Sequence, residues 1–378
     1  MNKEVTLEAV NRVMADDRLP VSVIMIITSS IGAVANCMIV FVFLFRLTKW
    51  MDSGRFFVPF LAMNDAIVCV VGTVYRVYLN FYFITPKSDI LCQIGTYFLD
   101  VFVHISSIIL LLIAVDRFLL FYHHGKKSFS LKQKWISLCA AVVIAAISGS
   151  TIWIFYGELE VQIKEHRNLN VENVTFHQCS EKHGSKNETA AVINTGIMLC
   201  LVFCQVIVMA VLYSYIARII HTAIKKRTHR NKINAPAKKD SMSKTSSFEL
   251  GPIGTKTDSI IKTERKTGRS RERLNSLWGK ALWRQTMAYH FRKHRFTYTF
   301  MVLTGVYAFN LIPSVVITLM SITVGEHTFW HQLTYNQLQA SLIAYNSNIF
   351  DSTIHPFIYG FLDTKLREEI KGMFNGRK

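Results

Sequence analysis

Long apolar stretches separated by polar connectors make up most of this chain. Seven of them are close to the length of about 20 residues with which a helix crosses roughly 30 Å of membrane hydrocarbon. They cover residues 21–45, 56–78, 90–121, 135–156, 190–223, 297–324 and 338–361. The pattern predicts an all-α membrane protein: a seven-transmembrane helix bundle with a short amphipathic cytoplasmic helix after the seventh span.

The composition favours a membrane protein over a soluble one. Hydrophobic residues make up 51% of the 378 residues, and the mean hydropathy is +0.26, which is more apolar than a soluble protein of this length. The net charge of +18 lies mainly on connectors that flank the membrane. We therefore expect contact with membrane lipids and no nucleic-acid partner. We predict no enzyme, no catalytic residue and no metal site.

Lys and Arg gather in alternate connectors, after spans 1, 3, 5 and 7. The positive-inside rule makes these connectors cytoplasmic, so the N-terminus faces outward from the plasma membrane. The expected segments are an extracellular N-terminus (1–20), spans 1–5 with their loops (21–223), a basic, largely disordered third cytoplasmic loop (224–295), spans 6 and 7 (296–361), and a cytoplasmic helix and tail (362–378).

The outer side carries two kinds of covalent candidates. Of seven cysteines, five lie well within apolar spans, whereas Cys92 is at the outer start of span 3 and Cys179 is in the long outer loop, both on the oxidising side. They are predicted to form a disulfide. Asn173 and Asn187 each begin an Asn-x-Thr sequon in the same outer loop, where they are candidates for glycosylation.

The third span ends in the charged sequence Asp116-Arg117-Phe118. Charges inside a membrane are costly and usually functional, although an Arg near the end of a span can reach the headgroups. Two interpretations remain open. Either this is a helix end that contacts the headgroups, or Arg117 switches between a neighbouring carboxylate and a partner from the water.

Several short motifs occur in the order and spacing of a known family. They are Asn36 in span 1, Leu61-Ala62-Met63-Asn64-Asp65 in span 2 (similar to LAxxD), Cys92 and Asp116-Arg117-Phe118 in span 3 (the latter similar to DRY), Tyr213-Ser-Tyr-Ile216 in span 5, Pro313 in span 6 and His355-Pro356-Phe-Ile-Tyr359 in span 7 (similar to NPxxY). Together they resemble the rhodopsin-like (class A) G-protein-coupled receptors, over all seven spans but not over 224–295. The chain departs from the family at Leu311, where the family has Trp, and at His355, where NPxxY has Asn.

The resemblance implies that an extracellular ligand activates a heterotrimeric G protein through outward movement of span 6. Pro313 would bend this span, and Tyr213 and Tyr359 would close around Arg117 in the active state. Arrestin and kinases are further expected partners at the third cytoplasmic loop, where residues 241–247 are rich in Ser and Thr.

A polar cluster is expected inside the bundle, formed by Asp65, Ser106, Asp351 and His355. Asp351 and His355 are four residues apart and share one helix face. In the family, the matching positions surround a sodium ion, and no other cofactor is expected. Carboxylates and hydroxyls suit a hard cation, while an imidazole can pair with a carboxylate or share its proton. Sodium, a shared proton, an Asp–His pair or a purely structural cluster all remain open.

The ligand is less well specified by the sequence. Candidate pocket residues are Arg76, Asp100, His104 and Tyr345, with Asp100 a candidate ion-pair partner of Arg76; the alternative for the aromatic members is an interfacial belt. Amine receptors of the family carry an Asp where this chain has Leu99. The absence of this Asp and the charged outer loop with its sequons favour a peptide ligand, and a small lipid or metabolite remains open. An intramembrane proton or ion transporter, motivated by the buried acids, and a receptor-like protein that does not signal remain alternative functions.

Overall fold

The computed structural model describes residues 3–47, 50–51, 54–82, 89–123, 128–163, 174–181, 188–233, 268–324 and 326–375. The chain forms two compact units, one of residues 1–213 and 296–378 and one of residues 214–295. The first unit contains the bundle and every candidate site residue that the structure describes.

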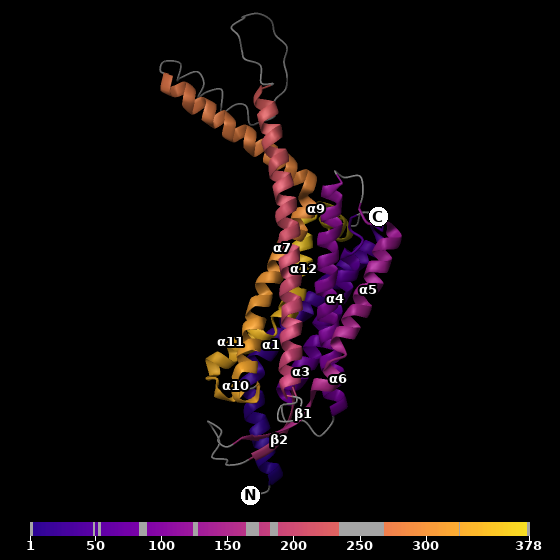
Figure 1. The fold of residues 1–378 in the computed structure, drawn as a ribbon, viewed down its shortest axis with the longest axis vertical. Helices are drawn as coiled ribbons and strands as arrows, with labels where there is room; N and C mark the ends of the chain where they lie inside the picture. Colours follow the sequence, from indigo (N-terminus) through magenta and orange to yellow (C-terminus); the bar gives the residue numbers. More distant parts are fainter. Residues whose placement is uncertain are drawn as a thin grey trace, which may run out of the picture. The chain divides into compact units, whose positions relative to one another are not determined.

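The described elements follow one another as α1 (Lys3–Phe45), α2 (Val58–Ile67), η1 (a π-helical turn, Val68–Gly72), α3 (Thr73–Phe81), α4 (Asp89–Tyr122), α5 (Leu131–Gly149), α6 (Ile152–Phe155), β1 (Tyr156–Ile163), β2 (Val174–Glu181), α7 (Glu188–Ile233), α9 (Gly268–Val324), α10 (Glu326–Gln332), α11 (Tyr335–Tyr345), α12 (Ser347–Leu362) and α13 (Thr364–Phe374). Within the first unit, α1 packs on α2, α3 and α12, and α4 packs on α5 (Figure 1).

The predicted seven-span architecture is confirmed, with the last span divided in two. Six helical segments of the described chain are long and apolar enough to cross a membrane: Glu8–Phe45, Val58–Phe81, Asp89–Tyr122, Leu131–Phe155, Val192–Lys226 and Thr297–Val324. The seventh apolar stretch forms α11 and α12, separated by Asn346. The Asn346 side chain donates to the Leu342 carbonyl at 2.8 Å, and such a bond competes with the helical backbone pattern.

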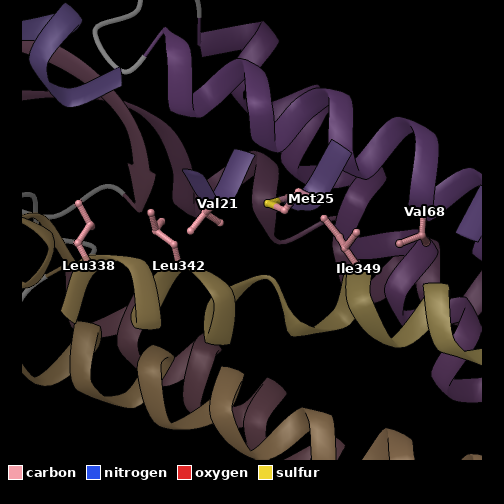
Figure 2. Packing of buried hydrophobic residues seen from close by; sticks show 6 residues of the cluster. All are labelled: Val21, Met25, Val68, Leu338, Leu342 and Ile349. Carbon is pink, nitrogen blue, oxygen red and sulfur yellow. The ribbon is translucent and has the colours of Figure 1, made fainter. Parts of the chain in front are cut away.

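The core of the bundle joins α1, η1, α11 and α12. Figure 2 shows its buried cluster of Val21, Met25, Val68, Leu338, Leu342 and Ile349. Further along, α1 and α12 approach so closely at Gly32 that a Cβ there would lie 2.7 Å from Thr353 Oγ1 and 2.9 Å from Thr353 Cα. A glycine at this position therefore allows the two backbones to pack together.

Large apolar side chains also cover the outside of the bundle. Val34 and Phe309 are each 72% exposed. A soluble protein would not expose so many such side chains, but lipid chains solvate them.

The predicted outer loop contains a two-stranded antiparallel hairpin. Strands β1 and β2 pair with Glu158 opposite Cys179. The predicted disulfide is formed: Cys92 at the start of α4 is bonded to Cys179, with their Cα atoms 5.6 Å apart. Figure 1 shows the start of α1 at this hairpin end of the bundle. The sequons at Asn173 and Asn187 lie outside the described residues.

Two segment boundaries differ from the sequence-based expectation. First, α1 begins at Lys3, so residues 3–20 belong to the first helix instead of preceding it. Second, residues 224–233 and 268–295 are helical where a largely disordered loop was predicted. Residues 234–267, including the Ser- and Thr-rich segment 241–247, lie outside the described part of the chain. The short helix expected after residue 362 is α13.

Candidate functional site

The buried acid of α2 is bonded to two other helices of the bundle. Asp65 Oδ1 accepts hydrogen bonds from the hydroxyls of Ser106 at 2.9 Å and Ser352 at 3.1 Å. Its Oδ2 lies 2.7 Å from Nδ1 of His355. Both Asp65 and His355 have exposed fractions of 0%, so this contact is shielded from bulk water and is strong in the low dielectric of the interior.

The second acid lies on the other side of the same imidazole. Asp351 Oδ2 is 3.2 Å from His355 Nε2, and Asp351 Oδ1 accepts a hydrogen bond from Asn310 Nδ2 of α9 at 2.9 Å. The imidazole thus lies between two carboxylates. Nδ1 forms a hydrogen bond with Asp65, whereas Nε2 has no hydrogen-bond partner among the described residues and contacts Asp351 by distance alone.

The structure brings all four predicted members of this cluster together and adds others. Ser352 and Asn310 were not predicted, although Ser352 directly follows Asp351. Asn64 also supports the cluster, because its Nδ2 donates to Ser106 Oγ at 2.7 Å. Asn36 Nδ2 donates to the Ser352 carbonyl at 2.9 Å.

The imidazole of His355 lies between the carboxylates of Asp65 and Asp351. Both oxygens of Asp65 already face protein donors, and the imidazole takes the place between the carboxylates that a bridging cation would need. Among the alternatives left open by the sequence, the geometry favours the Asp–His pair.

The charged pair at the far end of α4 is closed in this structure. The guanidinium of Arg117 pairs with the carboxylate of Asp116 and donates to the Gly54 carbonyl at 3.1 Å. Asp116 also accepts from the backbone N–H of Phe129 at 3.2 Å. Arg117 is 4% exposed. It is therefore held inside the protein and does not extend toward the headgroups.

The other predicted switch residues lie on α4, α7, α9 and α12. Tyr359 is buried and packs edge-to-face on Phe300, with ring centroids 6.2 Å apart. The hydroxyls of Tyr213 and Tyr359 are buried and have no hydrogen-bond partner among the described residues. Pro313 lies within α9, and Phe118 stacks on Tyr122.

Two cavities open near the hairpin end and share one set of walls. Their volumes are about 210 Å³ and about 100 Å³. Both are lined by Arg76, Thr96, Tyr156, Tyr345 and Asn346. The disulfide contributes Cys179 to the smaller cavity, so the hairpin forms part of its wall.

The Arg76–Asp100 ion pair suggested by the sequence is not formed. The Arg76 guanidinium lies over the Tyr345 ring, 4.5 Å from its centroid, and Arg76 Nε has no hydrogen-bond partner among the described residues. Asp100 instead contacts its own helix neighbour, His104, at 3.3 Å. Arg76, Asp100 and Tyr345 line the larger cavity, and His104 does not.

Comparisons with known proteins agree with this fold. A family profile described as "7 transmembrane receptor (rhodopsin family)" matches residues 35–359. The chain is similar to the solved structure of squid rhodopsin, with a TM-score of 0.60, 16% identity, and coverage of 97% of this chain and 86% of that one. This likeness concerns the fold alone.

Similar sequences come from several receptors. The chain is 29% identical to lysophosphatidic acid receptor 6 of Gallus gallus over 38% of this chain and 46% of that protein. It is 33% identical to lysophosphatidic acid receptor 4 of Homo sapiens over 32% of each. It is 30% identical to putative neuropeptide Y receptor 11 of Caenorhabditis elegans over 31% of this chain and 28% of that protein. The match spans less than half the length of each of these relatives.

Proposed function

The chain belongs to the rhodopsin family of seven-transmembrane receptors, and we propose that it converts the binding of an extracellular ligand into activation of a heterotrimeric G protein. The hairpin end faces outward in this proposal, as the charge of the connectors indicates. The observation that carries it is the position of two sites on one helix. Asp100 lines the ligand cavity, and Arg117 lies 17 residues further along α4, about 25 Å at 1.5 Å per residue.

Activation is a shift between two arrangements of the opposite end. In the resting arrangement Arg117 is paired with Asp116. A ligand that binds more tightly to the open arrangement shifts the population toward it. Bending of α9 at Pro313, where the helical hydrogen bond is missing, lets Arg117 leave Asp116 for a helix of the G protein. Kinases and arrestin are proposed to act at the 224–295 connector.

The cavity favours a ligand with a negatively charged group. Arg76 supplies a guanidinium whose described contact is an aromatic ring, and no carboxylate of the described residues forms an ion pair with it. A phosphate or carboxylate entering the cavity would gain a charge-assisted hydrogen bond from it. A peptide with a free C-terminus and a lysophospholipid both offer such a group, and the names of the similar receptors include lysophosphatidic acid and a neuropeptide.

The coupling is tested with Arg117→Ala in cells expressing the full chain. The variant should reach the surface and fail to stimulate GTPγS binding by G proteins, because the partner-contacting cation is missing. Wild-type stimulation by Arg117→Ala would contradict the proposal. Ligand binding without any G-protein response in the wild type would favour a receptor-like protein that does not signal.

The ligand class is tested with oleoyl lysophosphatidic acid on albumin in one arm, and matched peptides with free or amidated C-termini in the other. The arm that gives a response identifies the source of the anion. Arg76→Gln should weaken that response by about tenfold or more, the effect of losing one charge-assisted contact. Arg12→Gln is the control, because Arg12 is 76% exposed on α1. An unchanged response of Arg76→Gln would contradict the anion assignment.

A further inference from the structure

We propose that Gly54 and Arg55, in the loop between α1 and α2, are positioning residues that hold Arg117 in its resting arrangement and so restrain signalling. The proposal rests on the proposed function, because it takes Arg117 as the residue that engages the G protein. The contact with the loop restrains Arg117 in addition to its ion pair with the Asp116 carboxylate. Gly54 and Arg117, which are in contact, lie 63 positions apart in the sequence.

The contact of Gly54 with Arg117 leaves no room for a side chain. Arg117 Nη2 donates to the Gly54 carbonyl at 3.1 Å. A Cβ on residue 54 would lie 2.1 Å from Nη2, 2.4 Å from Nη1 and 2.6 Å from Cζ of Arg117. All three atoms belong to the end of a long side chain. A methyl group at this position would therefore displace the guanidinium and leave the backbone in place.

The next residue fixes the loop to the C-terminal part of the bundle. Arg55 forms two hydrogen bonds with the carboxylate of Asp363: Nε to Oδ2 at 2.8 Å and Nη2 to Oδ1 at 3.2 Å. Two-point contacts of this kind hold both the position and the orientation of the guanidinium. Asp363 is 4% exposed, and its backbone N–H donates to the Tyr359 carbonyl at 2.8 Å. The loop is therefore tied to the end of α12.

Aromatic rings also hold the loop in place. Phe56 packs against Trp50, Phe60 and Trp135, with ring centroids 6.1, 5.3 and 5.2 Å away. Phe56 is fully buried. The Gly54 carbonyl is thus presented to Arg117 by a loop with fixed residues following it, and a fixed acceptor costs less entropy to engage than a mobile one.

This restraint suits the rest of the chain. Residues 292–295, at the start of the sixth apolar stretch, read Arg-Lys-His-Arg and contain no carboxylate that could hold Arg117. The restraint also depends on α12, because Asp363 is bonded to the end of that helix. Movement of α12 during activation would pull on Arg55 and withdraw the Gly54 carbonyl from Arg117.

The test is ligand-independent GTPγS binding by membranes that contain equal amounts of surface receptor. Gly54→Ala should raise this basal signal by roughly tenfold, the population shift expected when a charge-assisted hydrogen bond is lost from the resting state alone. Gly196→Ala is the matched control, because a Cβ there meets nothing within 4 Å. The double variant Gly54→Ala with Arg117→Ala should lose the raised signal.

A second pair of variants decides the question if Gly54→Ala does not reach the surface. Arg55→Gln should raise basal signalling, and Arg55→Lys, which keeps the charge but not the two-point contact, should give a smaller rise. If Gly54→Ala reaches the surface and its basal signal equals that of the wild type, the restraint is overturned. If Gly54→Ala does not reach the surface, a basal signal of Arg55→Gln equal to that of the wild type overturns it. If Arg117→Ala nevertheless abolishes ligand-driven signalling, the proposed function stands without it.

Discussion

His355 Nδ1 lies 2.7 Å from Asp65 Oδ2, with both side chains fully buried. The contact joins α12 to α2 in the middle of the bundle. An unpaired carboxylate at this depth would be strongly disfavoured. The imidazole therefore gives this chain its own partner for an acid that would otherwise need a proton or a bound cation.

Replacing this imidazole should create a response to sodium. In His355→Asn the two carboxylates lose the group between them, and an amide oxygen joins the set of ligands that suit a hard cation. We expect sodium to lower basal signalling of His355→Asn by roughly fivefold, at the low end of coupling between two sites, and to leave the wild type unchanged. Basal GTPγS binding in sodium chloride and in N-methylglucamine chloride measures this. His177→Asn, a substitution in β2, is the control. Equal sodium responses in the wild type and in His355→Asn would contradict the prediction.

Loss of the disulfide should lower the amount of folded receptor. The bond closes a separation of 87 residues between Cys92 and Cys179, and removal of a native disulfide typically costs about 2–5 kcal/mol. Surface expression of the variant carrying Cys92→Ala and Cys179→Ala should fall well below wild type. Cys37→Ala, which removes a free and exposed cysteine, should have no such effect. Non-reducing peptide mapping that finds either thiol free in the mature wild type would refute the pairing.

A larger residue at Gly32 should destabilise the bundle. Two of the three atoms that a Cβ would meet belong to Thr353, and one of them is the backbone Cα, 2.9 Å away. A backbone atom cannot move aside as cheaply as a side-chain end, so Gly32→Val should cost about 1–3 kcal/mol. Thermal unfolding in detergent measures the loss, with Gly305→Ala as the control because nothing lies within 4 Å of a Cβ there. Equal melting temperatures would mean that α1 and α12 do not pack so closely.

The spans were predictable because a membrane demands about 20 consecutive apolar residues, which leaves a direct trace in the sequence. The beginning of α1 was missed because its first turns are polar overall. A helical period was present there nevertheless: Val10, Met14 and Arg18 are spaced by four and are all buried. Searching only for apolar length overlooks a helix that continues beyond the membrane.

The central cluster could be anticipated because Asp351 and His355 are one helical turn apart, and the family resemblance brings Asp65 beside them. The contacts of Arg76 with Tyr345 and of Arg117 with the Gly54 carbonyl could not be anticipated. A search for opposite charges predicted Asp100 for Arg76, whereas the structure uses the face of Tyr345, an alternative cation partner that charge counting ignores. Arg117 donates to the backbone carbonyl of Gly54. Because every residue has a backbone carbonyl, no side chain in the sequence indicates this contact.

The break at Asn346 divides the last span into two helical segments that can rotate separately about their axes. Tyr345, which lines the ligand cavity, ends the first segment, and the second carries His355 and Tyr359. If a ligand turns the first segment about its axis, the φ and ψ angles of one residue can take up this rotation. The second segment then does not turn with the first. The rotation that reaches the inner end is then limited by the stiffness of that single residue, so a substitution at Asn346 would alter how much of a ligand's efficacy is transmitted, in addition to changing the cavity wall that Asn346 itself lines.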